Sequence, residues 1–159
     1  VGLGETLNPE FKEYASQTVK NAQFLCSELQ KYNFQIVSGG TDKHLILIDL
    51  TNKPLLGKKF ARALDYAGII ANMNTMPQEK QSPANPSALR LGTPWITTRG
   101  MKESEITLIA AWINQVMESC SQWNELEFAD FENKVKSSPE IATIANQVQE
   151  LCMNFPLEI

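Results

Sequence analysis

The 159-residue chain is long enough for one domain with a substantial core, and 43% of its residues are hydrophobic. Its formal net charge is −4, and its 14 Lys and Arg residues are scattered rather than clustered, which argues against nucleic acid as a partner. No apolar stretch approaches the length that spans a bilayer, and no basic region followed by a hydrophobic core begins the sequence, so we expect neither a membrane partner nor export.

The first predicted element is a long amphipathic helix over residues 9–31. Its apolar residues recur three and four positions apart, and Asn8 is suited to the N-cap. Two apolar segments follow, at 34–37 and 45–50, and each has the composition of a strand. The Ser-Gly-Gly-Thr-Asp segment at 38–42 separates them with turn-forming residues, so the sequence predicts an antiparallel pair.

A second helix is predicted over 57–66, with Gly68 in a position suited to end it. Residues 69–72 then predict a further strand. The stretch 73–87 is the one long irregular segment, and it holds three prolines among Asn, Gln and Ser residues. Loops of this length inside a compact domain are usually functional or disordered.

The next strand carries an arginine in the middle of an apolar run. Because alternate side chains of a strand face opposite sides, Leu89 and Leu91 are expected to pack inward while Arg90 points the other way. A guanidinium held on a strand matches a carboxylate in two parallel hydrogen bonds, so Arg90 is a candidate for binding a small acid. The alternatives are an arginine paired with a local Asp or Glu, or one that is simply exposed. The residue pattern alone leaves these open.

Helices complete the chain. One is predicted to begin near Met101 or Lys102 and to run through Cys120, because its apolar residues recur at helical spacing. The tail predicts two shorter helices, one around Phe128 and one around Ile144. The order is therefore helix, two strands, helix, two strands and three helices.

This order predicts an α+β fold with a small, mostly antiparallel sheet covered by helices. We expect one domain over 1–159. In it the helix 9–31 leads into the sheet and helices of 34–120, and a helical tail follows at 127–155.

The cysteines form no close pair in the sequence. Cys26, Cys120 and Cys152 each fall on the apolar stripe of a predicted helix, so we interpret them as reduced core residues of a cytoplasmic protein. The only histidine, His44, has no Cys or His at a metal-ligand spacing. The sequence therefore predicts no metal site.

Several motifs match a known family in order and approximate spacing. They are Ser-Gly-Gly-Thr-Asp-Lys-His-Leu at 38–45 and Leu-Arg-Leu-Gly-Thr-Pro at 89–94, the latter followed by Thr-Arg-Gly at 98–100. These residues closely resemble the C-terminal part of serine hydroxymethyltransferase, a pyridoxal-phosphate enzyme. The leading Asn-Pro-Glu-Phe at 8–11 and Ala-Asn-Met-Asn at 71–74 also agree, so the resemblance covers essentially the whole chain.

The resemblance implies the small C-terminal domain of a fold type I pyridoxal-phosphate transferase. Family members interconvert serine and glycine and pass the one-carbon unit to tetrahydrofolate, in one-carbon metabolism and amino-acid biosynthesis, while pyridoxal phosphate stabilises the carbanion. By motif position, Arg90 resembles the arginine that binds the substrate carboxylate. Arg99 resembles a second arginine close to the active site, and the alternative is that it only anchors the preceding loop.

The resemblance also implies a folate site. Asn74 matches an asparagine near the folate pteridine, and Ser82 and Pro83 match a segment that touches folate. The alternatives are that Asn74 caps a turn and that the Ser-Pro pair is ordinary loop chemistry. Many bacterial members have Phe where this chain has Ala84, so only backbone contacts with folate are expected there. His44 is expected to be structural rather than a proton carrier.

The family's cofactor lysine and phosphate-binding residues belong to a large N-terminal domain, and no such stretch occurs here. We therefore expect the C-terminal domain of a longer cytoplasmic enzyme. It would have no catalytic residue of its own, would be inactive in isolation, and would leave pyridoxal phosphate mainly to the absent domain. Its expected partners are serine or glycine, folate, the large domain and a second subunit of a homodimer or tetramer. The alternative is a stand-alone α+β module that binds an anionic metabolite or a partner without chemistry; a purely structural role is a third.

Overall fold

The computed structural model describes residues 2–157 and confirms the α+β class. The elements follow the predicted order, with short helical segments added at the N-terminus, after the first strand and after the fourth. In chain order they are α1 (Gly2–Glu5), α2 (Pro9–Lys31), β1 (Gln35–Ile36), η1 (Val37–Gly39), β2 (Leu45–Asp49), α3 (Gly57–Tyr66), β3 (Asn72–Asn74), β4 (Ala88–Gly92), α4 (Pro94–Thr98), α5 (Glu103–Ser121), α6 (Phe128–Lys136) and α7 (Pro139–Asn154).

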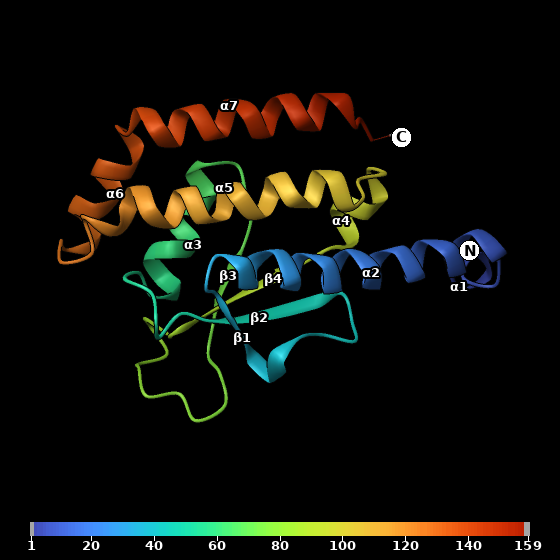
Figure 1. Cartoon of the computed structure of the whole chain (residues 1–159), viewed down its shortest axis with the longest axis horizontal. Helices are drawn as coiled ribbons and strands as arrows, with labels where there is room; N and C mark the ends of the chain where they lie inside the picture. The colour runs from blue at the N-terminus through green and yellow to red at the C-terminus, as the bar shows by residue number, and fades with distance from the viewer. Residues whose placement is uncertain (1, 158–159) are drawn as a thin grey trace.

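The four strands form one antiparallel sheet in the order β1-β2-β4-β3. The helices lie on one side of this sheet: α2 and α3 contact the strands, α5 contacts α2 and α3, and α7 lies on the outer side of α5 (Figure 1). No α-helix among the described residues covers the other side of the sheet, below which Figure 1 shows only the short η1 turn and a loop. The sheet therefore has one packed face and one uncovered face.

The core lies between the sheet and the helices. Ile46 and Ile48 of β2 and Leu89 and Leu91 of β4 are all buried, whereas Arg90 between the two leucines is exposed. This alternation confirms the predicted inward packing of both leucines. It follows from the pleat of a strand, which sends successive side chains to opposite faces.

The strand predicted at 69–72 is shifted: β3 begins only at Asn72. The reason is the way α3 ends. Gly68 adopts a φ of 79°, and Ile69 N donates a hydrogen bond of 2.9 Å to Leu64 O. A bond of this kind closes the C-terminus of a helix, so Ile69 still belongs to the helix end. Ile70, which is 75% exposed, then lies on the path to the sheet edge.

The first predicted strand is shorter than expected. Val37 belongs to the η1 turn rather than to β1, because the chain reverses there through Ser38 and Gly39, with φ values of 65° and 75°. Thr41 helps to shape the remainder of this turn, since its Oγ1 donates to Leu45 O over 2.7 Å. The antiparallel pairing of β1 with β2 is nevertheless as predicted.

Buried polar contacts fix α4, which the sequence analysis did not predict. Asn21, buried on α2, donates from Nδ2 to Thr97 Oγ1 over 2.9 Å and to Met101 O over 3.0 Å. An unsatisfied buried amide would be costly, so these bonds hold the short helix in one place against α2. The partners are far apart in the sequence, and no local pattern indicates them.

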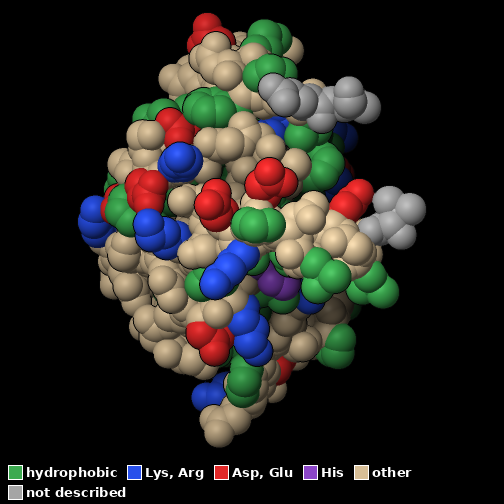
Figure 2. Space-filling view, turned by 90° about the vertical axis from the view of Figure 1, so that its right-hand side faces the viewer, with side chains coloured by type: hydrophobic (Ala, Val, Ile, Leu, Met, Phe, Trp, Pro, Cys, Tyr) green, Lys and Arg blue, Asp and Glu red, His purple; other side chains and the backbone are tan. Residues whose placement is uncertain are grey.

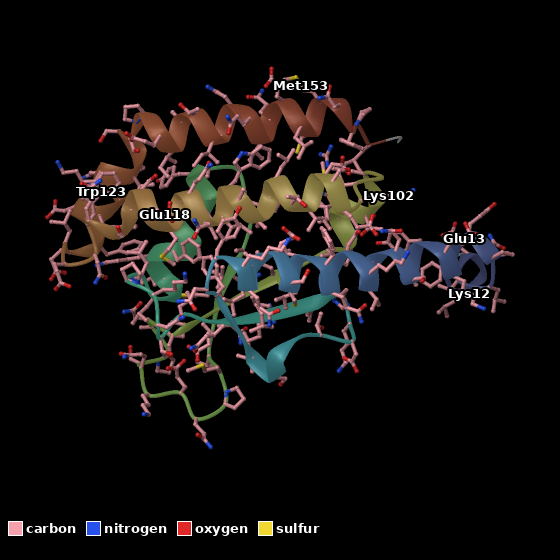
Figure 3. All side chains as sticks on the ribbon, in the orientation of Figure 1. Lys12, Glu13, Lys102, Glu118, Trp123 and Met153 are labelled. Carbon is pink, nitrogen blue, oxygen red and sulfur yellow. The ribbon has the colours of Figure 1, made fainter. Side chains whose placement is uncertain are left out.

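One end of α2 extends past the rest of the helical layer. The N-terminal part of α2, where Lys12 and Glu13 are labelled, projects beyond the body together with α1 (Figure 3). Met153 lies on the outer side of α7 (Figure 3).

The cysteines are free, with Cys26 and Cys120 buried and Cys152 half-buried. No helix within residues 2–157 is long and apolar enough to cross a membrane.

Candidate functional site

Arg90 projects from the centre of the uncovered face of the sheet. It lies between Leu47 of β2 and Asn72 of β3, which are its direct partners in the two ladders. The Arg90 side chain is exposed, and no ion pair or side-chain hydrogen bond within residues 2–157 involves its guanidinium. Of the two alternatives to a ligand role, pairing with a local carboxylate is thus not seen in the described part of the chain.

The two sequence motifs meet at one end of the β2–β4 ladder. Thr93, directly after β4, donates from its backbone N to His44 O over 3.1 Å. Its buried side chain donates from Oγ1 to Thr18 O of α2 over 2.7 Å. The Gly-Thr-Pro segment is therefore tied both to the start of β2 and to α2. These ties hold the register of β4, and hence the position of Arg90, against the helical layer.

Asn72 and Asn74 share the uncovered face with Arg90, because they occupy alternate positions of β3. Asn72 is exposed and stands opposite Arg90. Asn74 is half-buried and donates from Nδ2 to Thr75 O over 2.6 Å. That contact places the Asn74 amide at the start of the long loop. The contact does not test the expected folate role.

The loop of residues 75–87 borders the same face. Ser82 and Pro83 lie exposed near its tip, and Asn85 N donates to Ser82 O over 2.9 Å. An open cavity of about 790 Å³ lies between this loop and the β1–β2 end of the sheet. Its lining includes Gln35, Asp49, Met76, Gln78, Gln81 and Ser87. The polar loop, the cavity and the arginine thus occur together on one side of the molecule.

Glu79 is the one carboxylate of the loop of residues 75–87. Its oxygens accept hydrogen bonds from the side chain of Ser87 and from the backbone N atoms of Gln81 and Ser87. The Ser87 hydroxyl is the largest cause that lowers the pKa of Glu79, followed by the two backbone donors, and together they lower it to about 2. Glu79 is therefore ionised at neutral pH.

The structure places Arg99 in the helical layer. Its Nη1 donates to Phe155 O over 2.8 Å and to Cys152 O over 3.3 Å, both carbonyls at the C-terminal end of α7. Arg99 also lines a largely apolar cavity of about 540 Å³, which lies on the packed side of β4 because Leu91 lines it too. The structure therefore does not bring Arg99 to the face of Arg90. Its expected substrate contact stays a prediction.

His44 is exposed directly before β2, and Figure 2 shows this histidine, in purple, at the end of the molecule from which α1 projects. Its backbone O accepts the hydrogen bond from Thr93. This bond involves the backbone and not the imidazole, so the structural role expected for the His44 side chain stays a prediction. Within residues 2–157, no three His, Cys, Asp or Glu side chains converge on a metal-sized site.

Two residues on or beside this face, Asn72 of β3 and Glu79 of the loop, were not predicted from the sequence. The Asn-Met-Asn alternation at 72–74 is the signal that could have indicated Asn72. A strand beginning at residue 72 puts Asn72 and Asn74 on the same face of the sheet. Glu79 gave no local signal, because its partner Ser87 lies eight residues further along an irregular segment. Only the folded loop brings that carboxylate to the start of β4.

Comparison with known proteins gives a consistent result. The profile of the family described as serine hydroxymethyltransferase matches residues 1–113. A serine hydroxymethyltransferase of Acidothermus cellulolyticus is 47% identical over 156 residues, which cover 98% of this chain and 34% of that protein. Two from Legionella pneumophila, strains Corby and Lens, are 43% identical over 157 residues, 99% of this chain and 34% of theirs. The chain thus spans about a third of the length of the curated relatives it matches.

Proposed function

The chain belongs to the serine hydroxymethyltransferase family, and from this we propose that it forms the C-terminal domain of an enzyme that interconverts serine and glycine. In this proposal the one-carbon unit passes to tetrahydrofolate, and Arg90 binds the carboxylate of the amino acid. The observation that carries the proposal is the position of Arg90. It is an exposed guanidinium at the centre of an uncovered sheet face, without an acidic partner among the described residues.

A guanidinium at this position suits a carboxylate better than a point charge, such as an ammonium group, would. A guanidinium presents parallel N–H donors to the two oxygens of a carboxylate, and β4 is held on both sides by neighbouring strands. The backbone that carries Arg90 therefore loses little freedom when an acid binds. On β2 the direct partner of Arg90 is the half-buried Leu47, which is apolar and offers the guanidinium no competing acceptor.

Pyridoxal phosphate, when bound, supplies the electron sink for the carbanion of the amino acid. The side chains of β2, β3 and β4 that face the uncovered side include no lysine, so these strands do not supply an amine for the cofactor's aldehyde. We propose that the cofactor is held mainly by a large domain outside this chain, at the uncovered face. The part of this chain would be to bind and orient the substrate.

Folate would approach from the side of the loop. Asn74 on β3 and the exposed Ser82 and Pro83 border the face that carries Arg90, which supports their proposed contact with folate. Arg99 fixes α7 against the end of α4 through its bonds to two carbonyls of α7. Its direct contact with the substrate stays a prediction, which substitution of Arg99 would test. A homodimer or tetramer in the cytoplasm is part of the same proposal.

The test begins with the native polypeptide. The intact mass of this polypeptide, detected with an antibody against this chain, is expected to exceed that of the 159 residues. The additional sequence is expected to contain the cofactor lysine. The isolated chain is expected to show no cleavage of 3-hydroxy amino acids, and the complete enzyme is expected to show it. A native mass equal to that of this chain would instead support the stand-alone module that binds an anionic metabolite.

A further inference from the structure

Glu79 closes a ring of hydrogen bonds inside the loop of residues 75–87. One oxygen, Oε1, accepts from Gln81 N over 2.9 Å and from the Ser87 hydroxyl, and the other, Oε2, accepts from Ser87 N over 3.0 Å. The carboxylate therefore joins the first half of the loop to its last residue. Residues 80–86 are enclosed by this ring, with Ser82 and Pro83 at its exposed tip.

The last residue of the loop is firmly attached to the rest of the domain. Ser87 is only 1% exposed, and its O accepts from Leu50 N over 2.9 Å. The preceding residue, Pro86, accepts from Gly57 N over 2.9 Å at the start of α3. The Ser87 end of the ring is thus part of the scaffold, whereas the tip is in solvent. Glu79 connects the first half of the loop to this fixed end, because its carboxylate accepts hydrogen bonds from Ser87.

We propose that Glu79 is a positioning residue that holds the tip of the 75–87 loop in the shape that receives folate. The inference rests on the proposed function, because it takes Ser82 and Pro83 as folate contacts. A loop already ordered before binding loses less conformational entropy when the ligand arrives. Removing the ring should therefore weaken folate binding without touching the carboxylate site at Arg90.

The charge of Glu79 favours this role. Ionised oxygens accept stronger hydrogen bonds than neutral ones, and every partner of Glu79 in the ring is a donor. Glutamine keeps one acceptor oxygen but presents an amide NH₂ in place of the other, so it cannot accept from both Gln81 N and Ser87 N in the same geometry. Glu79→Gln is thus a nearly isosteric way to open the ring.

The experiment compares Glu79→Gln with Glu150→Gln in the complete enzyme. Glu150 is exposed on α7 and accepts no side-chain hydrogen bond within the described residues, so it controls for loss of one charge. For Glu79→Gln we expect faster hydrogen exchange in the peptide spanning 75–87 and a KM for tetrahydrofolate raised about tenfold, the loss expected from a charged hydrogen-bonding group. Folate-independent cleavage of a 3-hydroxy amino acid should keep its kcat/KM. Ser87→Ala, which removes one donor, should shift exchange and KM in the same direction by less.

The failures can be separated. Unchanged exchange in Glu79→Gln would overturn the inference, since the ring would not order the loop. Faster exchange with an unchanged KM for tetrahydrofolate would also overturn it. In either case a Ser82→Gly, Pro83→Ala double variant distinguishes a failure of the role of Glu79 from a failure of the proposed folate contacts. If that variant raises the folate KM, only the role of Glu79 has failed, and if it does not, the proposed folate contacts of the loop have failed as well.

Discussion

Asn72 and Arg90 are direct partners across the β3–β4 ladder, and both side chains are exposed on the uncovered face of the sheet. Directly opposed residues in an antiparallel pair have Cβ atoms about 5 Å apart, so their side chains can touch. An asparagine beside the guanidinium leaves its charge free for an external anion. A carboxylate in the same place would pair with it.

We therefore expect Asn72→Asp to raise the KM for serine in the complete enzyme by about tenfold, because the new carboxylate competes with the substrate for Arg90. Asn72→Ser is the matched control, since it removes the amide without adding charge, and it should change KM far less. Steady-state kinetics at low and high salt would check the prediction. Equal KM values in the two variants would contradict competition at Arg90.

Replacing Arg90 by Ala should raise the KM for serine by about a hundredfold or more, the loss expected for a bidentate charged contact. The side chain is exposed, so the free energy of unfolding should stay within about 0.5 kcal/mol of the parent. Arg90→Lys should rescue poorly, because an ammonium does not reproduce the planar fork. Enzyme kinetics and urea denaturation measure the two quantities, and normal serine affinity in Arg90→Ala would remove this residue from the site.

Glycine is required at position 57 because neighbouring backbone atoms leave no room for a Cβ, and not because of its φ angle. A Cβ at this position would lie 2.8 Å from Pro86 O and closer still to Ala88 O, both backbone atoms that flank the end of the long loop. Gly57→Ala should therefore destabilise the domain by about 1–3 kcal/mol, as overpacking does. Gly40→Ala is the control, because nothing lies within 4 Å of its Cβ position. A parent-like urea midpoint for Gly57→Ala would contradict the close contact.

Ser138 caps the N-terminus of α7. Its buried Oγ accepts from Ile141 N over 3.3 Å, which satisfies one of the free N–H groups at the helix start. Ser138→Ala should cost about 1 kcal/mol of unfolding free energy. The neighbouring Ser137 is exposed and caps no N-terminus, so Ser137→Ala should stay within about 0.5 kcal/mol. Equal losses in urea denaturation would show that the cap contributes nothing specific.

The cysteines should differ in reactivity. Burial disfavours the thiolate and raises the pKa of Cys26 to about 11 and that of Cys120 to about 12. Since the thiolate is the reactive form, these increases in pKa lower its population at pH 8 about a hundredfold for Cys26 and about a thousandfold for Cys120. Cys152, which is half-buried, should therefore be labelled first by a thiol reagent in the native chain. Mass spectrometry of the digested protein identifies the site, and prior labelling of Cys120 would contradict the packing.

Much of the architecture could be predicted from local patterns. The spacing of apolar residues indicated the helices at 9–31 and 57–66 with the bounds that α2 and α3 have. The two-residue alternation around Arg90 indicated which leucines are buried. The start of β3 was misplaced, because Ile69 completes the end of α3 through a hydrogen bond to Leu64 that composition does not reveal.

The sequence by itself determined the long helices, the α+β class, the orientation of Arg90 and the family, because periodicity and short motifs are properties of neighbouring residues. Only the tertiary structure decided which face of the sheet is uncovered, that Asn72 stands opposite Arg90, and that Arg99 donates to carbonyls at the end of α7. These relationships depend on strand register and on packing between distant segments. Asn21 and Thr97, which bond to each other across 76 residues of chain, owe their contact to the same long-range packing.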